Sequence, residues 1–202
     1  MNVKCFLIEE TGEIKRYLRR YAKGPCPNMP GNGGYHDMMV DFDIIPKDHD
    51  REDAALPEND QRWPSHCACG YEFAKSDKWQ LFTQRLYARK DTGEVMTLRD
   101  APVGAMWNAD WYPDVWKGKD GMSLMVRCPD GHDWCIDARA SNCGLPKDND
   151  HRCWIRHGVA PNITVNKACP GDNADRTCNA GSGSIQTGKW HGFLRNGEFV
   201  RC

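Results

Sequence analysis

The chain has 202 residues, a formal net charge of −1, 11 cysteines and eight tryptophans. Leu, Ile, Val and Phe together number only 32, a low share for a folded chain, but the small net charge argues against disorder. No stretch approaches the ~20 apolar residues of a membrane helix, the N-terminus lacks a signal-peptide pattern, and a pI near 6.6 argues against broad electrostatic binding to nucleic acid.

The first part of the chain is predicted to contain strands and loops. Residues 3–8 and 14–21 flank a turn signal at 10–13 and are expected to form a hairpin. A helix over 14–21 is the alternative, because its apolar residues have helical spacing. Residues 24–34, rich in Gly and Pro, and 46–64, polar with three prolines, are expected to be loops. One basic cluster is interpreted as the solvated face of a strand or helix: Lys15, Arg16, Arg19, Arg20 and Lys23.

Hairpins are also predicted further along the chain. The segment 190–200 has Asn196-Gly197 between apolar residues, which is the strongest short hairpin signal. The aromatic run of Trp107, Trp111, Tyr112 and Trp116 is interpreted as core, although exposed rings there would suit a binding platform. The other predicted elements are hairpins at 79–89 with 94–99 and at 122–128 with 132–137, and a short strand at 163–165 within an otherwise irregular segment, 138–183.

These elements indicate a mainly β fold, with α+β as the alternative. We expect small antiparallel hairpins with long irregular loops, stapled by zinc, by disulfides or by both, because the aliphatic core is thin. The predicted division places an N-terminal lobe at 1–100 and a cysteine-rich C-terminal lobe at 101–202; the alternative is that the two form one continuous domain.

The spacing of Cys and His residues predicts a metal site in the N-terminal half. Cys67-Ala-Cys69-Gly is similar to half of a zinc knuckle, because the Gly lets the backbone turn until both thiolates point at one ion. Cys26 and His36 complete a four-ligand set, with His66 as a substitute. Cysteines in a chain without a secretory signal are more often metal ligands than disulfides. Buried thiols that only fill space are the alternative.

A second candidate metal set lies in the C-terminal half. It consists of Cys143, His151, Cys153 and Cys178, with His157 in reserve, and here metal binding and simple packing are equally supported. Any zinc in these sets is expected to be structural, because closed Cys/His sets leave no open coordination position.

The remaining cysteines are candidates for disulfides. Cys128 and Cys135 flank an Asp-Gly turn, so they are expected to face each other across a hairpin, as a disulfide, half a metal site or packed thiols. Cys5 and Cys202 are further disulfide candidates without an assigned partner, and Cys202 could reach another chain.

Several phrases of the C-terminal half resemble an uncharacterised family of small proteins from tailed-bacteriophage genomes and bacterial metagenomes. They cover roughly residues 100–200 and are GAMW (104–107), DARASNC (137–143), HRCWIRHG (151–158), GSGSI (181–185) and HGFL (191–194); HCACGYEF (66–73) resembles a longer version of the same family. The resemblance implies a phage origin and metal binding, and it implies no reaction.

The sequence therefore favours a phage-encoded structural or binding protein, a virion component or a protein of the host cytoplasm. Its expected partners are a protein or further copies of itself, with no membrane and no nucleic acid. One alternative is a metal- or Cys-dependent hydrolase, nuclease-like, in which Cys143 would be paired with His151 or His191. Another is a host-directed interaction factor. No catalytic residue is assigned.

Overall fold

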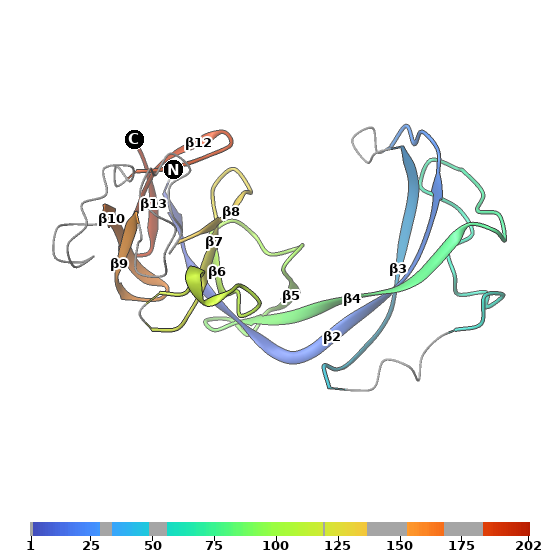
Figure 1. Ribbon diagram of the computed structural model, residues 1–202, viewed down its shortest axis with the longest axis horizontal. Helices are drawn as coiled ribbons and strands as arrows, with labels where there is room; N and C mark the ends of the chain where they lie inside the picture. Colours follow the sequence, from blue (N-terminus) through green and yellow to red (C-terminus); the bar gives the residue numbers. More distant parts are fainter. Residues whose placement is uncertain (1, 29–33, 49–55, 119, 137–152, 168–183) are drawn as a thin grey trace. The chain divides into compact units, whose positions relative to one another are not determined.

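The structure, a computed structural model, describes residues 2–28, 34–48, 56–118, 120–136, 153–167 and 184–202. The protein is mainly β, as predicted: these residues form strands and one short 3-10 turn, η2 (Asp114–Trp116), and contain no α-helix (Figure 1). The helical alternative for residues 14–21 is therefore wrong. A helix with the length and apolar character of a membrane span is likewise absent from this part of the chain.

The strands form three sheets in the described residues. One has the order β1-β13-β12-β11, a second pairs β10 with β9, and the third has the order β5-β4-β2-β6-β7-β8 with β3 paired on β2. The strands are β1 (Val3–Lys4), β2 (Phe6–Lys23), β3 (Tyr35–Pro46), β4 (Lys78–Arg89), β5 (Val95–Thr97), β6 (Ala105–Asn108), β7 (Leu124–Arg127), β8 (Asp133–Cys135), β9 (Trp154–Val159), β10 (Asn162–Lys167), β11 (Ile185–Thr187), β12 (Trp190–Arg195) and β13 (Glu198–Arg201).

Residue contacts divide the chain into two compact units. Unit 1 comprises Met1–Glu9 and Ala88–Cys202, and unit 2 comprises residues 10–87. The first unit is discontinuous because Val3 of β1 pairs with Phe199 of β13. The N-terminal residues thus belong to the same unit as the end of the chain.

Unit 1 is built around an apolar cluster that contains residues from both of its segments, 1–9 and 88–202. Cys5 and Cys128 lie in this cluster, and burial raises the pKa of each thiol to about 12. Cys128 is among the most deeply buried members of the cluster, and the others are Met106, Leu124, Val126, Ile136, Ile163, Ile185 and Leu194.

The predicted aromatic core is only partly correct. Trp107 of β6 is 2% exposed, but Trp111 and Trp116 are 48% and 40% exposed. The reason is local: Trp107 lies in a strand between β2 and β7, whereas the other two rings lie in the loop that contains η2. Tyr112 stacks on Trp116 with ring centroids 5.0 Å apart.

The predicted hairpin of residues 3–8 with 14–21 is wrong. β2 continues from Phe6 to Lys23 without reversing, although Gly12 has a positive φ of 81°. Each part of the strand has a different partner, since Phe6 and Leu7 pair with β6 while Glu13 to Lys23 pair with β3. The two halves therefore obtain their hydrogen bonds from other strands and not from each other.

The three later hairpins are confirmed, the first of them as the pairing of β4 with β5. In the last one, Arg195 of β12 pairs with Glu198 of β13, and both turn residues have positive φ, 47° at Asn196 and 74° at Gly197. These values suit the tight turn that Asn-Gly favours. The β7–β8 hairpin also forms where expected. The strand predicted at 163–165 is the middle of β10, and its partner β9 was not predicted.

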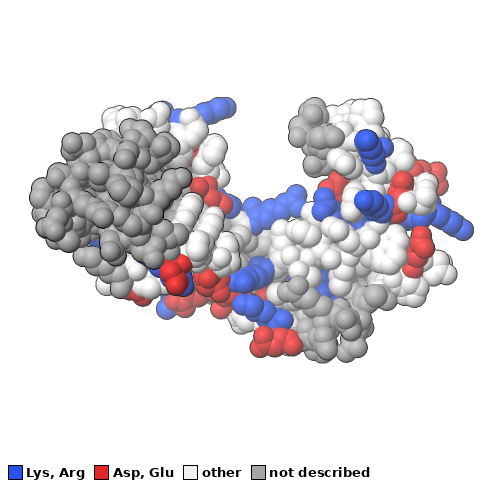
Figure 2. Space-filling view, viewed as in Figure 1, with Lys and Arg blue, Asp and Glu red and all other residues white. Residues whose placement is uncertain are grey.

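In unit 2, the cations of β2 alternate between two faces. Arg16 lies on the buried face, where its guanidinium contacts Asp43, so it is not the solvated residue that was predicted. Lys15 and Arg19 lie on the opposite face, and each forms an ion pair with an aspartate of β3. Figure 2 shows Lys and Arg side chains together with Asp and Glu side chains on the surface of this unit. Three of the five cations of this cluster therefore pair with aspartates of β3.

Candidate metal centre

Four predicted ligands come together in unit 2. The ligand atoms of Cys26, His36, Cys67 and Cys69 all lie within 4.8 Å of one another. Cys26 Sγ is 3.7 Å from Cys67 Sγ, and His36 Nδ1 is 3.2 Å from Cys69 Sγ. Three of the four residues are buried, and Cys69 is partly exposed. This cluster could hold one metal ion.

The strand register places the first two ligands at the same end of the β2–β3 pair. His36 is the second residue of β3 and pairs with Ala22, near the end of β2. Cys26 follows β2 after only two further residues, Gly24 and Pro25. Cys26 and His36 are therefore close together, because the chain leaves β2 and enters β3 at the same end of the strand pair.

A tight turn supplies the other two ligands. The Cys67 N–H donates to Tyr71 O at 2.8 Å, and the Gly70 N–H donates to Cys67 O at 2.9 Å. Gly70 has a φ of 91°, a conformation that costs glycine little. Both thiols consequently lie on one side of the turn, as the Cys-x-Cys-Gly spacing predicted.

Hydrogen bonding lowers the pKa of the Cys67 thiol. Its burial raises the pKa, but hydrogen bonds from the backbone of Cys69 and from the side chains of Cys69 and His36 outweigh this effect and lower the pKa to about 6. Burial raises the pKa of Cys26. A thiol with a low pKa is readily present as the thiolate, which is the form that binds metal.

A small apolar cluster surrounds the ligands. Ala22 and Phe73 are buried in contact with Cys26 and Cys67, and Met38 and Tyr71 pack against them. The Tyr71 ring stacks on the His36 ring. Tyr71 was not among the residues predicted for the site, although it stands two residues after Cys69.

The substitute ligand His66 does not join the cluster. Its side chain is exposed, and its Nδ1 lies 2.9 Å from Ser65 Oγ. Its backbone forms a bridge to Glu72, at the point where the chain enters the turn. Neighbouring residues of an extended segment point to opposite sides, so His66 faces away from Cys67.

Most of the second predicted metal set lies outside the described residues. This applies to Cys143, His151 and Cys178, whereas Cys153 is buried in unit 1 and the reserve ligand His157 is exposed on β9. The set therefore stays a prediction. The hydrolase alternative has the same status, because Cys143 and His151 are its central residues; His191 lies 3.1 Å from Ser184 Oγ through its Nε2.

No disulfide joins two of the described cysteines. The pairing expected between Cys128 and Cys135 is wrong, because the hairpin register places Cys135 opposite Met125. Cys128 instead lies at the turn, where its N–H donates to His132 O. Cys5 is buried in unit 1, and Cys202 is exposed, so neither forms the predicted cross-link with another described cysteine.

Comparison with models of protein families, with curated proteins and with solved structures finds no match. The function is therefore inferred from the residues of the cluster and their surroundings.

Proposed function

We propose that this protein is a structural or binding protein in which one zinc ion, held by Cys26, His36, Cys67 and Cys69, stabilises unit 2. The observation that carries the proposal is the convergence of three sulfur donors and one imidazole within 4.8 Å. Thiolate and imidazole are the donors that structural zinc prefers, and three Cys with one His is one of its usual ligand sets.

The distances support a tetrahedral ion. Zinc bonds of about 2.3 Å to sulfur and 2.0–2.1 Å to nitrogen place two thiolates about 3.8 Å apart and a thiolate and imidazole nitrogen about 3.6 Å apart. Cys26 and Cys67 are at 3.7 Å, and His36 Nδ1 and Cys69 Sγ are at 3.2 Å. The donors thus need to move by only a few tenths of an ångström along these two edges.

The number of donors favours a structural role over a catalytic one. Four protein ligands fill a tetrahedral ion, whereas a catalytic zinc keeps one position for water or substrate. The ion would tie together the loop at Cys26, the start of β3 and the turn at Cys67 and Cys69. Because the loop and the turn lack regular strands, a zinc ion would contribute directly to their folding free energy.

A binding role would use the surface of unit 1. Trp111 and Trp116 are large, exposed aromatic residues, and such residues are common anchors of protein interfaces. The resemblance to phage proteins supports a virion component, with a protein partner or further copies of this chain bound at such a surface. Mass spectrometry of purified particles tests this role: absence of the protein from the particles would favour a host-directed factor instead.

The zinc proposal is tested by elemental analysis of the purified full chain and of two variants. We expect Cys67→Ser to bind one zinc equivalent less than the wild type, and to lower the melting temperature of unit 2. His66→Ala is the matched control, because His66 is adjacent in sequence but exposed and outside the cluster. Equal zinc content in wild type and Cys67→Ser would refute the proposal.

A further inference from the structure

The imidazole ring of His36 is enclosed by two residues that are not metal ligands. Tyr71 covers one face of the ring: the ring centroids are 4.1 Å apart and the planes differ by only 8°. Gly24 lies at one edge, where an added Cβ would be 3.1 Å from both Cδ2 and Nε2. The ring is therefore held against rotation and against sliding toward β2.

The enclosure leaves the two ring nitrogens in different surroundings. Nε2 lies on the edge that the Gly24 backbone covers, whereas Nδ1 lies on the opposite side and is 3.2 Å from Cys69 Sγ. We infer that His36 binds the metal through Nδ1, and that Tyr71 is a positioning residue that holds the ring in this orientation. The inference rests on the proposed metal centre and adds its coordination geometry.

Tyr71 is itself fixed at both ends. Its backbone O accepts the Cys67 N–H, which places the residue within the ligand-bearing turn. Its hydroxyl donates to Asp77 Oδ2 at 3.2 Å, and the same carboxylate oxygen accepts the Ala74 N–H at 2.8 Å. Tyr71 thus connects the turn that carries two ligands to the strand that carries the third.

The contact between the two rings explains why an aromatic residue is needed here. A flat ring parallel to the imidazole covers its face and leaves the in-plane direction of the Nδ1 lone pair open to the metal. Removing groups that orient a metal-bound histidine typically weakens metal affinity about 10- to 100-fold. An aliphatic side chain at position 71 leaves the imidazole free to tilt, whereas phenylalanine keeps the stacked ring and loses only the bond to Asp77.

The experiment measures zinc affinity by chelator competition in the full chain. We expect Tyr71→Leu to weaken zinc binding about 10- to 100-fold, and Tyr71→Phe to stay within about threefold of the wild type. Tyr17→Leu is the control: it removes another partly buried tyrosine of unit 2, whose ring contacts include Phe82 and Lys15. Equal affinity of Tyr71→Leu and Tyr17→Leu would overturn the positioning role.

The nitrogen assignment is measured separately, by long-range proton–nitrogen NMR of His36 in the zinc-loaded wild type. A metal-bound Nδ1 and a protonated Nε2 support the inference, and the reverse overturns it. Because this spectrum needs no variant, it decides which nitrogen of His36 binds the metal even if Tyr71→Leu fails to fold. Failure of the zinc proposal is distinct: wild type and Cys67→Ser would then contain equal zinc, whatever the state of His36.

Discussion

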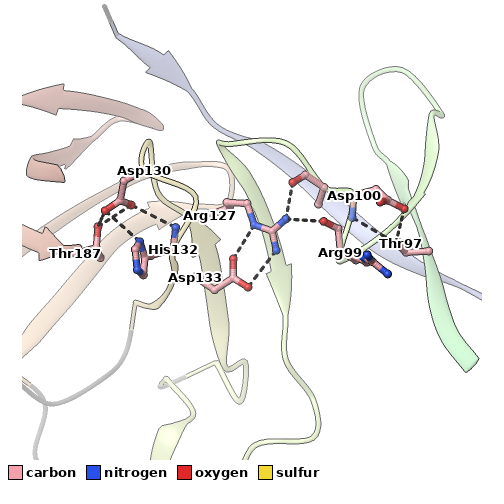
Figure 3. A network of polar contacts seen from close by, with 9 residues as sticks. Thr97, Arg99, Asp100, Arg127, Asp130, His132, Asp133 and Thr187 are labelled. Carbon is pink, nitrogen blue, oxygen red and sulfur yellow. Dashed lines mark hydrogen bonds and ion pairs between the residues drawn. The ribbon is translucent and has the colours of Figure 1, made fainter. Parts of the chain in front are cut away.

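Asp130 offers the sharpest test of how unit 1 is held together. Its side chain is only 7% exposed and lies in the turn between β7 and β8. It accepts hydrogen bonds from Thr187 Oγ1 at 3.0 Å (Figure 3) and from the N–H groups of Lys189 and Trp190 at 2.8 and 3.2 Å. One carboxylate therefore joins the β7–β8 turn to the β11–β12 turn, which is more than 50 residues away in sequence.

We expect Asp130→Ala to destabilise unit 1 by about 2–4 kcal/mol. A hydrogen bond to a charged group contributes roughly 1.5–3 kcal/mol, and a donor left buried without a partner costs about 1–3 kcal/mol. The loss of stability should be smaller than the sum of these contributions over all three hydrogen bonds, because the Lys189 N–H is exposed and can donate to water instead. For a unit of this size the loss corresponds to a fall in melting temperature on the order of 10 °C.

The effect should depend on pH in a defined direction. Burial raises the pKa of Asp130, but hydrogen bonds from the backbone of Lys189 and His132 and from Thr187 outweigh burial and lower the pKa. A carboxyl with a lowered pKa in the folded state stabilises the protein above its unfolded pKa of about 3.9. This stabilisation is lost as the pH falls through the folded pKa. The difference between wild type and Asp130→Asn should therefore shrink below about pH 4.

Urea unfolding followed by the NMR signals of β7, β8, β11 and β12 measures these differences. Asp133→Ala is the matched control, because Asp133 belongs to the same hairpin but is 38% exposed in its ion pair with Arg127. An exposed pair contributes about 0–1 kcal/mol. If Asp130→Ala costs no more than Asp133→Ala, or if the cost of Asp130→Asn is the same at pH 2.5 as at pH 7, the carboxylate does not join the two turns as described.

Three further predictions concern the core, the backbone and the metal. Trp107→Ala should cost about 3–5 kcal/mol, whereas Trp111→Ala, at an exposed position, should change stability by less than about 1 kcal/mol in the same urea assay. Gly104→Ala should cost clearly more than Gly93→Ala: both glycines have positive φ, but only at Gly104 would a Cβ approach a backbone oxygen, that of Lys4, to 2.6 Å. Metal chelation should increase amide hydrogen exchange at residues 24–28 and 66–71 and leave β7 and β8 unchanged; equal protection with and without chelator would contradict a structural ion.

The sequence predicts hairpins well where a turn and its two strands are adjacent. Asn196-Gly197 is an example, because the turn chemistry and the apolar flanks both act within a dozen residues. The same reasoning failed at residues 10–13, where the second half of β2 pairs with the following strand, β3, and its start pairs with β6, about 100 residues further along the chain. Tertiary pairing of this kind leaves no local pattern, and neither does the pairing of Val3 with Phe199.

The candidate site was predictable in its ligands but not in its surroundings. Cys67 and Cys69 were found because a short, Gly-terminated spacing limits where the thiolates can point. His36 and Cys26 were predicted because a tetrahedral zinc ion needs two ligands in addition to these thiolates. Tyr71 could not be assigned, because stacking on His36 depends on the packing of the turn against β3. The disulfide predicted for Cys128 and Cys135 failed for a related reason: a register offset of a few residues decides which side chains meet.

Cysteine has different surroundings in the two units. In unit 1, Cys5 and Cys128 lie within a broad cluster of Ile, Leu, Val and aromatic residues, and their raised pKa values suit neutral thiols that pack as apolar groups. In unit 2, the cluster around Cys26 and Cys67 contains few apolar residues, so apolar burial contributes little there. A metal ion would therefore matter most around Cys26 and Cys67, where a small apolar cluster packs the loop against the turn.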